Sequence, residues 1–70
     1  MKDYYAGMTY QPLISQLLQL THLTWDGDLI SKSERTKLVK AELAQRVKGG
    51  WNIITSNGIE YLEKLKFIHP

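Results

Sequence analysis

Apolar residues first recur with helical spacing between residues 9 and 20. Thr9 can cap the start of this predicted helix, and Pro12 is tolerated in its first turn. The pattern ends at residues 21–23, and Asp26-Gly27 is a turn signal, so residues 24–30 are predicted as a connection with room for a short strand. The predicted apolar stripe consists of Leu13, Ile14, Leu17 and Leu18, widened by Leu20.

A second helix is predicted over residues 32–41. Ser31 and Glu34 have the spacing of a capping box, in which the Ser31 hydroxyl accepts from the Glu34 amide and the Glu34 carboxylate reaches back. The buried side is predicted at Leu38 and Val39, and Leu43 extends it after the helix ends. At roughly 100° per residue, the opposite face is polar and basic and consists of Ser33, Thr36, Lys37 and Lys40.

Two short segments rich in β-forming residues, 44–47 and 51–55, flank the Gly49-Gly50 pair. Because glycine supplies the positive φ that a tight turn requires, the pattern predicts a β-hairpin with Lys48 at its tip. We expect Trp51 to anchor this hairpin to the core; the alternative for an exposed tryptophan beside a basic tip is stacking on the bases of a single-stranded nucleic acid.

A last helix is predicted after Thr55, whose side chain can cap it. Three apolar residues spaced by three, Ile59, Leu62 and Leu65, are predicted to face inward. Four charged residues of this segment are predicted to remain in water: Glu60, Glu63, Lys64 and Lys66.

The predicted order of elements resembles the winged helix-turn-helix family. In that family a leucine lies in the recognition helix, a second leucine follows the helix, and a two-stranded wing leads into a Thr-x-x-Gly-x-x-x-Leu motif. The matching residues here are Leu38, Leu43, Gly49, Gly50, Thr55, Gly58 and Leu62. The resemblance covers about residues 11–67 and is typical of small bacterial and phage regulators. It implies an α+β fold with helices packed on a two- or three-stranded antiparallel sheet, formed by one domain over residues 9–70 after a flexible arm at residues 1–8.

The chain departs from the family pattern at two places. Glu42 stands where the family usually has glycine, and a non-glycine residue in the left-handed conformation costs about 1 kcal/mol. We therefore expect the exit from the second helix to differ. Residues 24–30 are also too few for the usual positioning helix, so a strand or a single turn is expected to replace it.

The charge of the chain is polarised. The formal net charge is +2, but the segment from Ser31 to Lys48 holds six basic and two acidic residues, a net charge of +4, and the rest of the chain carries −2. Combined with the family resemblance, this distribution predicts binding to double-stranded DNA by a small transcriptional regulator or accessory factor. The residues expected to contact DNA are Lys32, Ser33, Thr36, Lys37 and Lys40 from the helix, and Arg46 and Lys48 from the wing.

Other interpretations of the same residues remain open. Arg35 points toward the Val39 side of its helix and could pair with Asp26 or Asp28 instead of binding DNA. The basic residues could form an ordinary solvated helix face. The fold could also serve as a protein-interaction module, for example a phage-type inhibitor or adaptor. In either function the leucine-rich first helix and the last helix could bind a second copy or a protein partner, or their apolar residues could be buried in the core.

The residue types give little support to catalysis. There is no cysteine, and His22 and His69 lack metal-ligand spacing. The pair Asp26 and Asp28 around a glycine forms a turn without the further ligands of a calcium loop. We expect no enzyme activity, no cofactor and no metal. No apolar run approaches the roughly 18 residues that a membrane-spanning helix needs, and the start of the chain lacks the apolar stretch of a secretion signal, so we expect a cytoplasmic protein.

Overall fold

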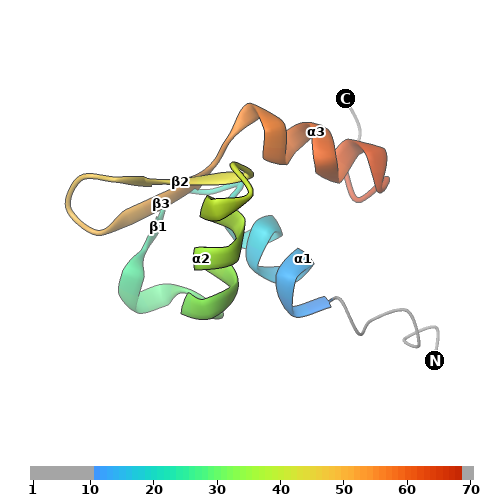
Figure 1. Ribbon diagram of the computed structural model, residues 1–70. Coiled ribbons are helices and arrows are strands. Elements are labelled where there is room, and N and C mark those ends of the chain that lie inside the picture. The colour runs from blue at the N-terminus through green and yellow to red at the C-terminus, as the bar shows by residue number, and fades with distance from the viewer. Residues whose placement is uncertain (1–10, 69–70) are drawn as a thin grey trace.

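The computed structural model describes residues 11–68. The predicted arm at residues 1–8 and the predicted cap at Thr9 lie outside the described residues. Within residues 11–68 the fold is α+β, with three α-helices, one short 3₁₀ turn and a three-stranded antiparallel sheet (Figure 1). The elements are α1 (Gln11–Gln19), β1 (Thr24–Trp25), η2 (Asp26–Asp28), α2 (Lys32–Lys40), β2 (Ala44–Val47), β3 (Trp51–Ile54) and α3 (Ser56–Lys64).

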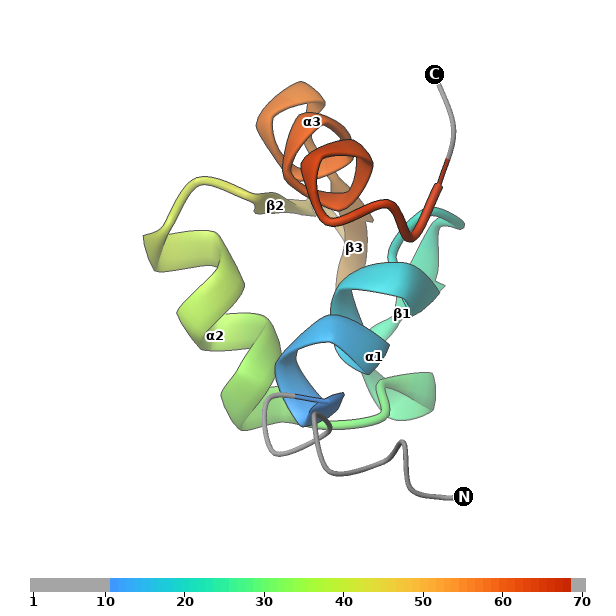
Figure 2. The same cartoon turned by 90° about the vertical axis from the view of Figure 1, so that its right-hand side faces the viewer.

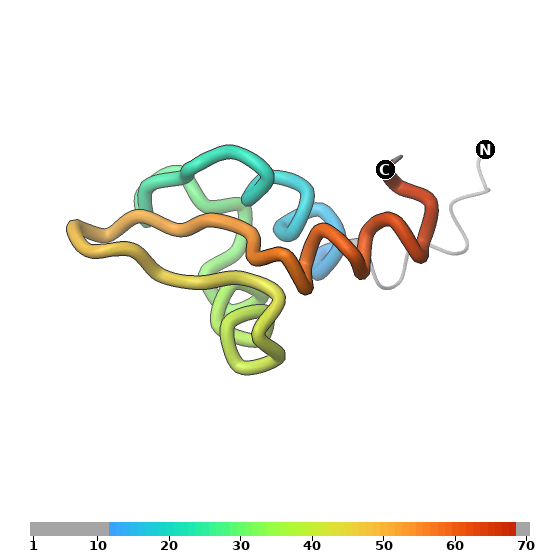
Figure 3. Tube along the Cα trace, turned by 90° about the horizontal axis from the view of Figure 1, so that it is seen from above, coloured from blue at the N-terminus to red at the C-terminus, as the bar shows by residue number. Residues whose placement is uncertain are grey.

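The sheet has the strand order β1-β3-β2, so the short strand β1 pairs with β3 at the edge of the β2–β3 hairpin. Helices α1 and α2 lie on one side of this sheet, and α3 continues from β3 away from the hairpin tip (Figures 1 and 3). The register places Thr24 and Arg46 opposite Asn52 on the helix-covered face, and Trp25 and Val47 opposite Trp51 on the other face.

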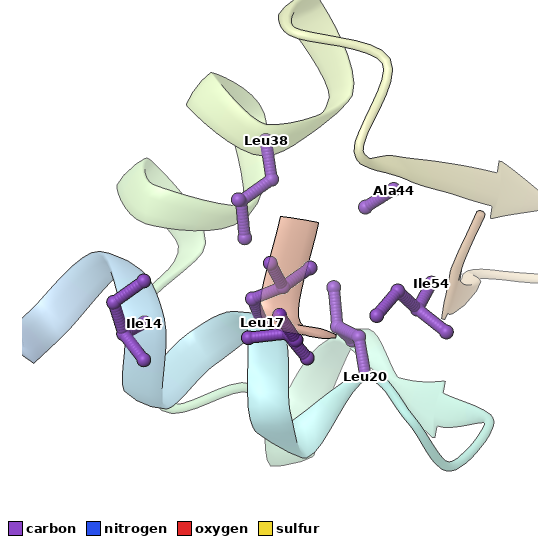
Figure 4. Close-up of a cluster of buried hydrophobic side chains, with 7 residues drawn as sticks. Ile14, Leu17, Leu20, Leu38, Ala44 and Ile54 are labelled. Atoms are coloured by element: carbon purple, nitrogen blue, oxygen red, sulfur yellow. The ribbon is translucent and has the colours of Figure 1, made fainter. Parts of the chain in front are cut away.

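The core lies where the three helices meet the base of the hairpin (Figures 2 and 4). Ile14 and Leu17 of α1 and Leu20 just after it are buried there, which confirms the predicted stripe, and Leu13 and Leu18 pack against it partly buried. The remaining buried apolar side chains come from four other segments: Leu38, Ala44, Ile54 and Leu62. Because a chain this short buries little surface, each of these side chains contributes a large part of the core.

The predicted inward face of α3 is wrong at two of its three positions. Leu62 is fully buried, but Ile59 is 40% exposed and Leu65 is 42% exposed. The reason lies at Gly58, whose missing Cβ would overlap the carbonyl oxygen of Leu43. This close approach turns Gly58 and Leu62, one helical turn apart, toward the core. Ile59 is then rotated away, and Leu65 follows the last residue of the helix.

The start of α2 shows half of the predicted capping box. The Ser31 hydroxyl accepts from the Glu34 amide at 3.2 Å, as expected. The Glu34 carboxylate does not reach back; the Ser31 amide instead donates to Oε1 of Gln16 at 2.7 Å. Gln16 is fully buried, and its Nε2 donates to Gln19. A side chain of α1 therefore accepts from the Ser31 amide, which in a capping box would donate to the Glu34 carboxylate.

The exit of α2 has a left-handed residue, as a glycine would provide, although this residue is a glutamate. Glu42 adopts φ 64°, in the left-handed region, so the expectation of a different exit is wrong. Its amide donates to Val39 at 3.0 Å, and the Leu43 amide donates to Leu38 at 2.9 Å, which together form a Schellman motif. The carbonyl of Glu42 also accepts from the Thr55 hydroxyl at 2.7 Å, so this turn is bonded to the residue that caps α3.

The connection between β1 and α2 contains a single 3₁₀ turn, η2, and no full helix, which confirms the prediction for residues 24–30. Gln19 holds this connection against α1, since its Nε2 donates to the Asp28 carbonyl at 2.7 Å and its Oε1 accepts from the Ile30 amide at 3.1 Å. None of the helices within residues 11–68 has the length and apolar character needed to span a membrane.

Candidate nucleic-acid interface

The outward face of α2 is solvent-exposed at every position predicted for it. Four residues that the sequence placed on one side of this helix, Ser33, Thr36, Lys37 and Lys40, are all exposed, and Lys32 is exposed at its first position. We call the first four the α2 face. Helical spacing brings them together on one side of α2, while Leu38 on the other side enters the core.

Local contacts restrain two members of the α2 face. The Thr36 hydroxyl donates to the Lys32 carbonyl at 3.0 Å, and the Ser33 and Ser31 hydroxyls lie 3.1 Å apart. Lys37 Nζ lies 3.5 Å from a carboxylate oxygen of Glu34, but the lysine side chain is 67% exposed. An ion pair this exposed contributes little to stability, so Lys37 can exchange Glu34 for another anion at small cost.

The hairpin tip forms as predicted. Gly49 and Gly50 have φ 96° and 85°, values that favour glycine, and both lie in the turn between β2 and β3. Lys48 is exposed beside them. Within residues 11–68, Lys32, Lys40 and Lys48 form no ion pair, so no acidic side chain of that part of the chain holds them.

Arg46, which is also predicted to contact DNA, forms a short ion pair within the fold. Its Nη2 lies 2.7 Å from Oδ2 of Asp26, and its side chain is 50% exposed. The register explains this pairing, since Arg46 lies opposite Asn52 on the helix-covered face of the sheet, where η2 also lies. The charge of Arg46 is therefore partly offset, and it is less available to a phosphate than Lys48.

Arg35 is withdrawn from the surface. It is buried at 8% exposure, and its Nη1 donates to Oδ1 of Asp26 at 3.0 Å and to Oδ1 of Asn52 at 2.9 Å. Of the alternatives open for this residue, pairing with Asp26 is confirmed. Asn52 itself, which is fully buried, was missed by sequence reasoning, because expecting Trp51 to face the core places its neighbour on the same strand toward water.

Asp26 is the centre of this cluster, which we call the Asp26 network: Asp26, Arg35, Arg46 and Asn52. Asn52 Nδ2 donates to Oδ1 of Asp26 at 2.8 Å and also to the Thr24 carbonyl at 3.0 Å. The hydrogen bond from Asn52, followed by the hydrogen bond and charge of Arg35 and the charge of Arg46, lowers the pKa of Asp26 against the opposing effect of desolvation. Asp26 is therefore held as a carboxylate.

The Asp26 network fixes the hairpin relative to α2. Its members come from four different elements, η2, α2, β2 and β3, and the Asp26 amide additionally donates to the Gly50 carbonyl at 2.8 Å. The network thus ties the helix that carries the α2 face to the hairpin that carries Lys48. It positions the two parts of the predicted interface, while its own Arg35 is buried and does not belong to that interface.

The expectation for Trp51 is wrong. Trp51 is 39% exposed and Trp25 is 49% exposed, and the register places the two opposite each other on the sheet face that α1 and α2 do not cover. Trp51 therefore does not anchor the hairpin to the core. The anchoring positions on β3 are Asn52 and Ile54, which alternate with the tryptophan and point inward.

Within residues 11–68, no group of three or more histidine or acidic side chains lies close enough together to hold a metal ion. Comparisons of the chain with models of known protein families, with curated proteins and with solved structures found no match.

Proposed function

We propose that this protein binds double-stranded DNA as a small winged-helix domain, with α2 as the recognition helix and the β2–β3 hairpin as the wing. The observation that carries the proposal is the α2 face: four adjacent polar or basic side chains, all exposed, on a helix whose opposite side is buried. The cytoplasmic location expected from the sequence fits a regulator or accessory factor of DNA transactions.

The order of elements supports the winged-helix interpretation. A helix, a short strand, a turn, a second helix and a hairpin follow one another along the chain. The short strand β1, which precedes the turn, pairs with the hairpin and completes the three-stranded sheet. In a winged helix the recognition helix enters the major groove, and the wing contacts the neighbouring backbone. The single turn η2 stands in place of the usual positioning helix.

The chemistry of the α2 face suits phosphate and base contacts. Lys37 and Lys40 can neutralise phosphates or donate to guanine edges, while Ser33 and Thr36 supply short hydroxyl donors. Lys48 adds charge from the hairpin tip. Phosphate neutralisation releases counterions, so the affinity of such an interface falls as salt rises.

The test compares wild type with Lys37→Ala/Lys40→Ala in titrations of a mixed-sequence DNA duplex at several salt concentrations. Loss of two phosphate contacts is expected to weaken binding and to reduce the slope of log affinity against log salt by roughly 2. Lys64→Ala/Lys66→Ala is the matched control, because it removes the same charge from the far end of α3 and the turn that follows it. Equal affinity and slope in wild type and the Lys37/Lys40 variant would refute docking through α2.

A second candidate function, binding of a protein partner, is favoured by one observation. Ile59, Leu65 and Phe67 are 37–42% exposed on or just after α3, which projects beyond the sheet at the end away from the hairpin tip (Figure 3). We propose that this end contacts a second copy of the chain. Sedimentation at increasing concentration tests it: dimers that Ile59→Lys dissociates support the contact, and a monomer at all concentrations removes it.

A further inference from the structure

The outer face of the hairpin carries an exposed aromatic pair that the α2 face does not use. Trp25 and Trp51 lie directly opposite each other on neighbouring strands, and Val47, 40% exposed, continues the row from β2. The sheet face that holds them is on the side away from α1 and α2 (Figure 1). Large aromatic side chains are normally buried on folding, so a pair of half-exposed indoles on one face indicates a binding surface.

Glycines lie beside both rings, and the ring of Trp25 packs closely on one of them. A Cβ on Gly27 would overlap the six-membered ring of Trp25, so that ring lies directly over the Gly27 backbone. Gly50 lies beside the same indole, and a Cβ on Gly49 would lie 3.4 Å from Cδ1 of Trp51. The Trp25 ring is thus restrained on one side by backbone while part of it remains open to solvent, which lowers the entropy lost when a ligand packs on it.

The charge around the pair selects the kind of ligand. Residues 44–54, which form the hairpin, contain Arg46 and Lys48 and no acidic residue. By contrast, α3 carries Glu60 and Glu63 against Lys64. Arg46 is paired with Asp26, and Asp26, next to Trp25, is bonded by both Arg35 and Arg46, so the cation left beside the aromatic faces is Lys48 at the hairpin tip. Aromatic faces beside this lysine fit a polymer with flat bases and a phosphate backbone better than they fit an apolar protein surface or the acidic α3 of a second copy.

We propose that Trp25 and Trp51 form a stacking platform for unpaired bases, with Lys48 contacting the adjoining phosphate, so that the hairpin binds single-stranded nucleic acid. In a duplex the bases are already stacked and their faces are not available to a tryptophan, so this surface is distinct in its target from the α2 face. The proposal goes beyond duplex binding and does not depend on it.

Tryptophan fluorescence reports on this surface alone, because Trp25 and Trp51 are the only two tryptophans of the chain. The probe is oligodeoxyuridylate, which forms no duplex, with oligouridylate of equal length as the second arm to distinguish DNA from RNA by the 2′-hydroxyl. Stacking is expected to quench the emission, and the quenching is expected to weaken as salt rises.

Variants at Trp51 distinguish aromatic stacking from non-specific hydrophobic binding. Trp51→Leu keeps an apolar side chain but removes the aromatic face, and is expected to weaken binding by roughly 5- to 150-fold, whereas Trp51→Phe retains most of it. Gln45→Ala, on the same outer face of β2, is the matched control and is expected to bind like wild type. Amide NMR spectra establish that each variant is folded; if the leucine variant is not, Lys48→Gln still tests the phosphate contact, since it is expected to weaken binding and its salt dependence while both tryptophans stay in place.

Two binding results would overturn the platform: no quenching by either probe at low salt, or equal affinity of folded Trp51→Leu and wild type. Concentration-dependent dimers that Trp51→Leu dissociates would also overturn it, because they would assign the face to a second copy. The Lys37→Ala/Lys40→Ala variant distinguishes the two surfaces. It is expected to weaken duplex binding and keep the affinity for oligodeoxyuridylate, so either proposal can fail without the other.

Discussion

Asp26 accepts a hydrogen bond from Arg35 at 3.0 Å, and this ion pair connects the turn after β1 to the middle of α2. The side chain of Arg35 is 10% exposed and that of Asp26 is 30% exposed, so the pair is largely withdrawn from water. Burying charges is costly unless they are paired and hydrogen-bonded, and here Asn52 and Arg46 supply the further partners. The pair therefore specifies how α2 and the hairpin are oriented more than it adds to stability.

Asp26→Asn is expected to lower stability at neutral pH, because the amide cannot offset the charges of Arg35 and Arg46. The folded state lowers the pKa of Asp26 below the value of about 3.9 that an aspartate has in an unfolded chain. Such a group stabilises the fold above the unfolded pKa, and the contribution is lost as pH falls through the folded pKa. The stability difference between wild type and Asp26→Asn should thus be full at neutral pH and shrink below about pH 4.

Urea unfolding at a series of pH values measures this difference directly. A gap between wild type and Asp26→Asn that stays constant into strong acid would contradict the role of the carboxylate. Because the Asp26 network also positions the hairpin, we expect the same variant to lose affinity for duplex DNA while keeping the α2 face intact. Unchanged duplex affinity in a folded Asp26→Asn protein would show that the interface does not need the network.

Glu42→Gly and Lys66→Gly are each expected to stabilise the protein by about 0.5–1 kcal/mol, since both residues have positive φ, 64° and 62°. The Lys66 and Phe67 amides donate to Glu63 and Leu62, each at 2.9 Å, the same motif that ends α2. For a domain of this size the gain corresponds to a rise in melting temperature of roughly 2–8 °C. Ala41→Gly, at φ −84°, is the control and is expected to destabilise. Lower melting temperatures for both glycine variants would mean that their side chains make contacts that outweigh the strain.

Local signals in the sequence were sufficient to predict most of the fold. The apolar spacing of α1, the Ser31 and Thr55 caps, and the Gly49-Gly50 turn each act within a few residues, and each is confirmed. The α2 face follows from the same reasoning, because exposure of a helix side depends on which residues on the other side are apolar. The arm at residues 1–8 and the DNA contacts themselves remain predictions.

What the sequence could not reveal depends on contacts between distant residues. Arg35 and Asn52 are 17 residues apart, and Gln16 and Ser31 are 15 apart, so neither pairing leaves a periodic pattern. Each buries a polar side chain that single-sequence reasoning places in water by default. The exposure of Trp51 has the same origin. Residues of β3 alternate between the two faces of the sheet, and because Asn52 faces α2 in the Asp26 network, Trp51 faces the other way.

Gly58→Ala is expected to destabilise the protein, although helix propensity alone predicts the opposite. Alanine in place of glycine favours a helix by about 1 kcal/mol, but here the new Cβ would overlap the Leu43 carbonyl oxygen and lie 2.5 Å from Cγ1 of Ile54. Displacing backbone to accommodate it should give a net loss of about 1–3 kcal/mol in thermal unfolding. Asn57→Ala, at the exposed neighbouring position, is the control and should change stability by less than about 0.5 kcal/mol. A higher melting temperature for Gly58→Ala would mean that α3 can move off the Leu43 turn freely.

Gln16→Leu tests whether α1 sets the start of α2. The wild-type Oε1 accepts from the Ser31 amide at 2.7 Å from a fully buried side chain, and leucine offers no acceptor. An unsatisfied amide costs about 1–3 kcal/mol, so the variant should be less stable even though leucine is the more apolar residue.

Hydrogen exchange locates the effect of Gln16→Leu. The Ser31 amide should be protected in wild type and exchange faster in the variant, while Leu38, deep in the same helix, keeps its protection relative to global unfolding. Ser15→Ala, the adjacent residue, controls for general loosening of α1. If Ser31 stays as protected in Gln16→Leu as in wild type, another acceptor has replaced the glutamine; if protection is lost and duplex affinity falls with it, the position of the α2 face depends on a side chain of α1 that never touches the DNA.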